Sequence, residues 1–168
     1  MVMSECTLLL GSNAGERYRN LAEAEALVQK RLGKILKQSA VYETAAWGNP
    51  DQPDFLNRVV VIDTALTPAR LMERILSLEE EMGRIRVKKW DQRVIDIDIL
   101  LYGRELIETG RLTIPHPLIP ERRFTLVPLA EVAGDFVHPR LGKTISVLLR
   151  ECRDPLSVQV YSPRRGAS

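Results

Sequence analysis

Two aspartates one residue apart, Asp96 and Asp98, stand in an otherwise apolar run that predicts a β-strand over residues 94–102. Successive side chains of a strand point to opposite faces, so both carboxylates share one face, with their β-carbons roughly 7 Å apart. Carboxylates this close repel each other, and at least one pKa rises unless cations lie between them. Mg²⁺ suits all-oxygen ligation and is usually shared with substrate phosphates, and Arg93 can pair with a phosphate. The pattern indicates metal-assisted phosphoryl chemistry; a solvated strand face is the alternative, but Asp is depleted in strands.

A second group of candidate residues surrounds a loop. Residues 44–54 are rich in Pro, Gly, Asn and Asp, which favours a connection without regular structure. Loops of this length often act as lids. Trp47, Phe55 and Asn57 lie in it or just beyond it, and aromatic faces beside an amide suit a flat heterocycle. For Phe55, packing in the core is the competing interpretation.

A histidine and a short turn are weaker indications. His116 lies between two prolines, which fix the position of its ring. Three neighbours favour a phosphate contact over a purely structural histidine: Arg111, Thr113 and Arg122. The turn from Gly11 to Asn13 follows a strand and precedes a helix, where backbone N–H groups could meet a phosphate. A plain strand-to-helix turn is the other interpretation.

The elements that must position these residues alternate along the chain. Apolar spacing and capping residues predict strands over residues 7–10, 35–43, 56–64 and 94–102, and helices over residues 17–32 and 68–83. Further helices are expected near residues 121–132 and 145–152. Thr67 is the expected N-cap of the second helix, and Gly33 is expected to end the first. The order β-α-β-β-α-β is that of a ferredoxin-like α+β sandwich with a mostly antiparallel sheet. Two helices would cover one face and leave the other free to present the aspartates.

Composition limits the class of protein. The chain has 168 residues, and we expect residues 1–168 to form a single domain. Its 45% hydrophobic content is ordinary for a globular protein, and a net charge of +2 indicates neither a nucleic-acid nor a membrane partner. Cys6 and Cys152 lack metal-type spacing and fit a reducing cytoplasm. No apolar stretch approaches the roughly 18 residues of a membrane span, and no signal peptide is recognisable. We expect a cytoplasmic monomer.

Three collinear stretches carry a resemblance to a known family. They are residues 42–44 with Gly48, Gln52, Phe55 and Asn57; residues 83–86 running to residues 93–98; and residues 114–117 with Arg122, Phe124, Pro128 and Leu129. Together they resemble the 6-hydroxymethyl-7,8-dihydropterin pyrophosphokinases of folate biosynthesis. No single stretch is decisive, but the set is specific, and the likeness extends over residues 8–139.

The resemblance implies transfer of pyrophosphate from ATP, the co-substrate, to the hydroxymethyl group of a dihydropterin, with release of AMP. It implies two Mg²⁺ ions held by Asp96 and Asp98, with Arg84 and Arg93 guarding the phosphates. Positioning and electrostatics dominate such transfers, so no side-chain base is required. The pterin would be bound by Gly11, Thr44, Ala45, Ala46, Phe55, Asn57 and Phe124. ATP would contact Glu79, Arg84, Arg86, Trp90, Arg93, Ile99, Arg111, Thr113, His116 and Arg122.

The chain departs from the family's usual pattern in two loops. Trp90-Asp-Gln-Arg93 stands where the family often has Trp-Gly-Pro-Arg, and Ala46 stands where Pro is common. Both departures fall in segments that the resemblance implies close over the substrates, residues 45–54 and 84–92. Neither departure touches the metal carboxylates or the two phenylalanines, Phe55 and Phe124, that the resemblance places on either side of the pterin.

Two other classes of protein share parts of the pattern. Nucleotidyltransferases also combine Gly-Ser with an Asp-x-Asp strand, but within one short unit, whereas Ser12 and Asp96 are far apart here. A ferredoxin-like RNA-binding module needs stacking aromatics on its central strands and a basic surface. This chain has paired aspartates there and only 5% aromatic residues. The sequence therefore favours the pyrophosphokinase.

Overall fold

The protein is built around one large antiparallel sheet. The computed structural model describes residues 2–48, 51–83 and 93–163. The strands of the sheet are β1 (Ser4–Ser12), β2 (Lys34–Gln38), β3 (Tyr42–Thr44), β4 (Phe55–Thr64), β5 (Asp96–Tyr102) and β8 (Val158–Val160). They lie in the order β5-β1-β4-β3-β8, and β2 also pairs with β4. A small separate hairpin joins β6 (Ile107–Glu108) to β7 (Thr113–Ile114).

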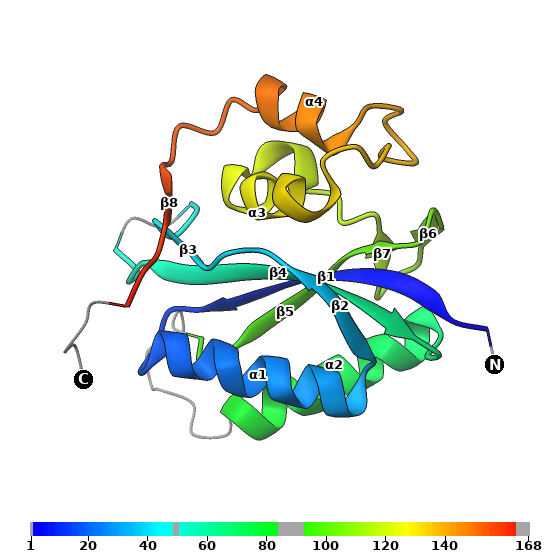
Figure 1. The fold of residues 1–168 in the computed structure, drawn as a ribbon, viewed down its shortest axis with the longest axis horizontal. Coiled ribbons are helices and arrows are strands. Elements are labelled where there is room, and N and C mark those ends of the chain that lie inside the picture. Colours follow the sequence, from blue (N-terminus) through cyan, green and yellow to red (C-terminus); the bar gives the residue numbers. More distant parts are fainter. Residues whose placement is uncertain (1, 49–50, 84–92, 164–168) are drawn as a thin grey trace.

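Helices lie on both faces of this sheet. Those within the described ranges are α1 (Arg17–Arg31), α2 (Pro68–Gly83), α3 (Arg123–Ala133) and α4 (Ile145–Glu151), with a 3-10 turn at Ile119–Glu121 before α3. Helices α1 and α2 cover one face, while α3 covers the other with α4 outside it (Figure 1). The order of elements and the position of β1 between β5 and β4 confirm the predicted ferredoxin-like sandwich.

The prediction that one sheet face stays free was wrong over most of that face. Alternate residues of the central strands, such as Leu8 and Val60, enter the core beneath α1 and α2. Their neighbours Leu9 and Val59 enter a second core with α3 and α4. Helix α3 is apolar on the side that meets the sheet, so it buries this surface, which strand alternation alone does not reveal. The face stays open at the cavity that is lined by Asp96 and Asp98.

The predicted strand over residues 35–43 is two strands instead. Ser39 lies between β2 and β3, and its hydroxyl accepts a hydrogen bond from the Val59 N–H (3.0 Å). The Ala40 N–H is bonded by the carboxylate of Glu131 on α3 (2.9 Å) rather than by a neighbouring strand. The Ser39 N–H still donates to the Val59 carbonyl oxygen (2.9 Å), so side chains replace only part of the backbone ladder where β2 ends and β3 has not yet begun.

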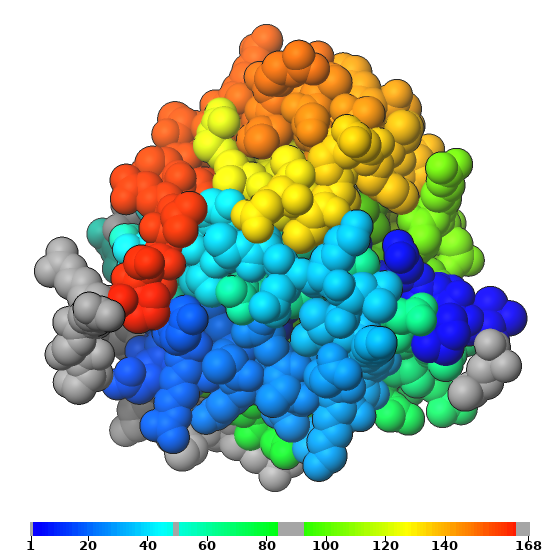
Figure 2. Space-filling model, viewed as in Figure 1, coloured from blue at the N-terminus to red at the C-terminus, as the bar shows by residue number. Residues whose placement is uncertain are grey.

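Several element boundaries also differ from the expected ones. Strand β5 begins at Asp96 rather than at residue 94, and α3 begins at Arg123 after the 3-10 turn. Strand β8 was not predicted; it pairs with β3 and runs along the surface beside α1 (Figures 1 and 2).

Both predicted helix caps are confirmed. Thr67 Oγ1 accepts a hydrogen bond from the Arg70 N–H (3.3 Å), and the Gly33 N–H donates to the Val28 carbonyl oxygen (3.1 Å). No helix in the described ranges combines the length and hydropathy needed to traverse a bilayer.

Candidate active site

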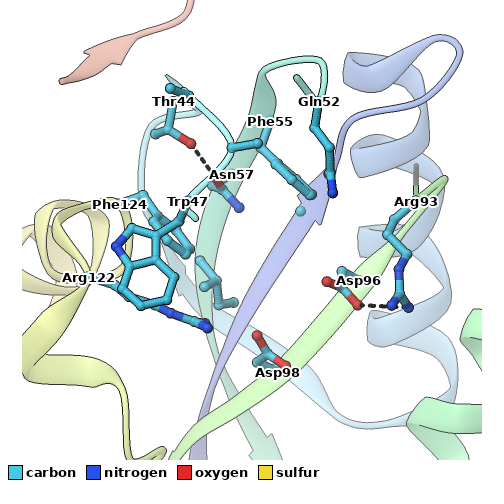
Figure 3. Close-up of a pocket in the computed structure, with 14 residues that line it drawn as sticks. Thr44, Trp47, Gln52, Phe55, Asn57, Arg93, Asp96, Asp98, Arg122 and Phe124 are labelled. Carbon is cyan, nitrogen blue, oxygen red and sulfur yellow. Dashed lines mark hydrogen bonds and ion pairs between the residues drawn. The ribbon is translucent and has the colours of Figure 1, made fainter. Parts of the chain in front are cut away.

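A cavity of about 230 Å³ opens where the sheet is left uncovered. Three strands meet there in register, because Gly11 on β1 lies opposite both Asn57 on β4 and Asp96 on β5. Figure 3 shows the aspartates at one end of the cavity and the aromatic residues at the other. Its lining residues are Leu9, Gly11, Thr44, Ala45, Ala46, Trp47, Gln52, Phe55, Asn57, Arg93, Asp96, Asp98, Arg122 and Phe124.

The two aspartates share one face of β5, as predicted. Ile97 and Ile99, which alternate with them, are buried in the core under α1 and α2. Burial raises the pKa of both Asp96 and Asp98, and the charge of Asp98 raises the pKa of Asp96 further. Arg93 and Arg122 act in the opposite direction. Two desolvated carboxylates incompletely balanced by positive charge form a site that favours a cation.

Aromatic and amide side chains form a slot beside the carboxylates. Phe55 and Phe124 lie on either side of Asn57 in the view of Figure 3. Thr44 Oγ1 donates a hydrogen bond to Asn57 Oδ1 (3.0 Å), which fixes the amide so that its nitrogen turns away from Thr44. The Asn57 side chain is buried, and its Nδ2 lies 3.5 Å from the Leu10 carbonyl oxygen. The slot can therefore stack a flat ring and donate a hydrogen bond to its edge.

Gly11 is required at the base of this slot. A Cβ at this position would lie 2.7 Å from Asn57 Nδ2 and 3.4 Å from a ring carbon of Phe55. We therefore expect Gly11→Ala to displace the Asn57 amide and to lower kcat/KM for the ring substrate by about 10- to 100-fold. Gly110→Ala is the matched control, since a Cβ there meets nothing within 4 Å. Equal kinetics for both variants would show that the close approach at Gly11 has no bearing on the slot.

Arg93 is held at the edge of the cavity by the buried Asn13. The Arg93 N–H donates to Asn13 Oδ1 (2.7 Å), and the Asn13 N–H donates to the Arg93 carbonyl oxygen (3.0 Å). Asn13 Nδ2 also donates to Gln52 Oε1 (3.0 Å), which ties the loop before β4 to the same point. The interpretation of this turn as a phosphate site is therefore not supported for the Asn13 N–H, which already has a backbone partner.

Arg122, at the N-terminus of α3, lines the same cavity as the two carboxylates. Its guanidinium carbon lies 4.9 Å from the Trp47 ring centroid and 5.4 Å from that of Phe124. Burial lowers the pKa of Arg122, and the charges of Asp98 and Asp96 act in the opposite direction. This side chain therefore connects the aromatic and acidic ends of the cavity.

Four further predicted ATP contacts, Ile99, Arg111, Thr113 and His116, lie in β5 or in the segment around β7. His116 Nδ1 accepts from the Leu118 N–H (3.1 Å), and burial, followed by the Arg122 charge, lowers the His116 pKa. A neutral ring with this bond carries its proton on Nε2, where it can donate to a phosphate. The Ile99 side chain is in the core, so only its main chain is available to a ligand. Thr113 is half-buried in β7, and Arg111 is exposed just before it.

Glu79 projects from α2 to the outer edge of β5. Its Oε2 accepts the N–H of Ile97 (2.8 Å), a group that an edge strand would otherwise leave unpaired. Burial raises the Glu79 pKa to about 7, and the charges of Asp96 and Asp98 add to the increase. Glu79 thus supports the strand that carries the aspartates and shares in their electrostatic field.

We expect the Glu79 proton to make stability depend on pH. Because folding raises this pKa from 4.5 to about 7, the folded protein loses stability as the pH rises through that window. Glu79→Gln keeps an oxygen for the Ile97 N–H and removes the charge. Its unfolding free energy should exceed that of the wild type by about 1–2 kcal/mol at pH 8 and match it near pH 4.5. Urea titrations at both pH values measure this; a gap that does not change with pH would contradict it.

Some predicted site residues are not described by the structure, and some residues of the cavity were not predicted. Arg84, Arg86 and Trp90 lie outside the described residues. Asn13 was not predicted to have a side-chain role, and Trp47 and Gln52 line the cavity although they were absent from the predicted pterin set. The proximity of Trp47 to Phe55 and Asn57 in the sequence was the available signal; nothing in the sequence pairs Trp47 with Arg122.

The fold is that of the ferredoxin-like α+β sandwiches, and the cavity sets an aromatic slot beside two carboxylates and two arginines. The family model for 7,8-dihydro-6-hydroxymethylpterin-pyrophosphokinase matches residues 7–134. The chain is 46% identical over 158 residues to the 2-amino-4-hydroxy-6-hydroxymethyldihydropteridine pyrophosphokinase of Methylorubrum extorquens, covering 94% of this chain and 98% of that one. It is 43% identical over 143 residues to the Synechocystis enzyme of the same name, covering 84% and 73%.

Solved structures agree on the fold. A Plasmodium falciparum HPPK-DHPS triple mutant aligns with a TM-score of 0.72 at 19% identity, over 89% of this chain. The chain spans only 43% of that longer protein. By the family match and its relatives, the chain belongs to the 7,8-dihydro-6-hydroxymethylpterin-pyrophosphokinase family.

Proposed function

We propose that this protein transfers pyrophosphate from ATP to the hydroxymethyl group of 6-hydroxymethyl-7,8-dihydropterin and releases AMP, as a step of folate biosynthesis. One observation carries the proposal: the slot of Phe55, Asn57 and Phe124 opens into the same cavity as Asp96 and Asp98. A ring bound in the slot would place its substituent beside the carboxylates. Membership of the pyrophosphokinase family supports the same reaction.

The aspartates fit Mg²⁺, and we propose that they hold two ions with the triphosphate. Their donors are oxygens, and burial has raised their pKa values, which a divalent cation would reverse. In the described part of the chain no cluster of three or more His, Cys, Asp or Glu could hold a metal. Water and substrate phosphates must therefore supply the other ligands. When bound, Mg²⁺ would neutralise charge on the triphosphate and make the attacking hydroxyl more acidic.

The protein's own residues would bind and align the two substrates. Asn57 and the main chain of residues 44–46 would orient the pterin between Phe55 and Phe124. Arg93, anchored by Asn13, and Arg122 would stabilise the phosphates as charge develops during transfer. His116 would donate from Nε2, and Glu79 would hold β5 in place. The family resemblance adds Arg84, Arg86 and Trp90, with Ile99, Arg111 and Thr113, to the ATP site.

We further propose that residues 1–168 act as a single pyrophosphokinase domain and as a cytoplasmic monomer whose partners are small molecules. Its two cysteines are buried, as free thiols in a reducing compartment can be. A sedimentation experiment at micromolar concentration tests the oligomeric state. A stable dimer would contradict this part of the proposal.

The test of the reaction compares two acceptors with ATP and Mg²⁺. With 6-hydroxymethyl-7,8-dihydropterin we expect AMP in equal amount to the modified pterin. With 6-methyl-7,8-dihydropterin, which fits the slot but lacks the hydroxyl, we expect binding and no AMP. AMP release with both acceptors would indicate simple hydrolysis, and release with neither would contradict the proposed reaction.

A further inference from the structure

Trp47 has an environment that its position in the chain does not explain. It follows Ala46, which is buried in the wall of the ring slot, yet Trp47 itself is 41% exposed. An indole ring left this open to water is not held by core packing. The contact found for it is with the guanidinium of Arg122, at 4.9 Å from the ring centroid. Figure 3 shows the indole lying over the Arg122 side chain.

Arg122, in turn, is held largely by aromatic faces. Its guanidinium lies between Trp47 and Phe124, at 4.9 and 5.4 Å from their centroids. Its Nε is buried without a hydrogen-bond partner among the residues described. A guanidinium has five donors in a rigid plane, so stacking on rings fixes its plane when hydrogen bonds do not. Removing one ring would leave the charge free to turn away from the acidic end of the cavity.

We propose that Trp47 is a positioning residue for Arg122, and through it for the triphosphate of ATP, rather than a wall of the pterin slot. Arg122 lines the same cavity as Asp96 and Asp98, so its charge would meet phosphates that are bound beside those carboxylates. The loop that supplies the pterin contacts Thr44, Ala45 and Ala46 thus also orders a cation of the ATP site. The inference rests on the proposed function for the identity of the ligands.

If Trp47 orders Arg122, changing it should weaken the binding of ATP. Its position in the chain next to Ala46 would instead predict a loss of pterin binding. Trp47→Leu should weaken ATP binding by about threefold to tenfold, the range for a cation–π contact at a partly exposed site, and change pterin affinity by less than about twofold. Trp47→Phe should restore most of the ATP affinity because it keeps an aromatic face. In an Arg122→Met background, Trp47→Leu should have no further effect. Tyr18→Leu is the matched control, since Tyr18 is an exposed ring that packs on Tyr161 away from the cavity.

Calorimetry of Mg·ATP and of the pterin, each alone, decides between the outcomes, with thermal unfolding of every variant to confirm folding. Loss of pterin affinity with unchanged ATP affinity would overturn the inference and make Trp47 a slot residue. Equal losses of ATP affinity with and without Arg122 would also overturn it. Because binding is measured without turnover, a wild type that binds ATP but forms no AMP would contradict the proposed function alone. The comparison of Trp47 variants would still hold.

Discussion

Asp96→Asn and Asp98→Asn should each lower kcat by about 10²- to 10³-fold or more, while the pterin still binds. Each change keeps the size of the side chain and removes one negative charge from a pair of carboxylates that share a strand face. Without that charge, a divalent cation loses a fully charged oxygen ligand. It then neutralises less of the negative charge that develops on the triphosphate during transfer. Steady-state rates at saturating ATP and pterin, with Mg²⁺ varied, measure the loss.

Stability distinguishes this loss from misfolding. Folding raises the pKa of Asp96 and Asp98 above the ordinary 3.8, so their ionised forms oppose folding at neutral pH. The two Asn variants should therefore unfold at the same or a higher temperature than the wild type. Asp63→Asn, on β4 at the far end of the sheet, is the control and should keep full activity. Near-normal turnover by either variant at any Mg²⁺ concentration would rule out the carboxylate site.

The second large effect is expected at Asn57. Asn57→Asp keeps the shape and the bond from Thr44 Oγ1 but replaces the Nδ2 donor by an acceptor. The edge of the pterin would then meet a buried carboxylate oxygen where it needs a hydrogen-bond donor, and neither group would have a partner. We expect the pterin dissociation constant to rise by about 10²-fold or more and that of Mg·ATP to stay within about threefold.

Fluorescence titration with each ligand separately provides this measurement. Retained ATP binding serves as the internal control for folding, because a buried Asp also lowers stability. If ATP and pterin affinities fall together, the variant has lost its structure rather than its recognition. If pterin affinity is unchanged in a folded variant, Asn57 does not recognise the ring.

The features that could be predicted from the sequence are those with a local signal. The alternation of Asp96 and Asp98 with Ile97 and Ile99 fixed their common face, because the side-chain period of a strand is two residues. The helix at residues 68–83 followed from Thr67 and an apolar stripe of period 3.6. The family resemblance supplied the ring contacts, and the structure brings Phe55, Asn57 and Phe124 into one cavity.

The features that could not be predicted depend on contacts between distant segments. Between β2 and β3 the Ala40 N–H is bonded by Glu131 on α3 rather than by a strand, a partner 91 residues away in the sequence. The second face of the sheet is buried because α3 packs on it. The apolar residues 126 and 129 predict that this helix has a buried side, but not which surface of the protein it packs against. Asn13 joins Gln52 to Arg93, and Trp47 meets Arg122, across separations that no short-range pattern encodes. These tertiary links set the geometry of the site.

We propose that the protein moves a pyrophosphoryl group, not a single phosphoryl group, onto the pterin hydroxyl. Phosphorus NMR of the products formed from ATP, Mg²⁺ and 6-hydroxymethyl-7,8-dihydropterin tests it most directly. We predict AMP and a pterin carrying two coupled phosphorus nuclei, formed in equal amounts and absent with Asp96→Asn and Asp98→Asn. ADP with a pterin monophosphate would contradict the account and make the protein an ordinary kinase.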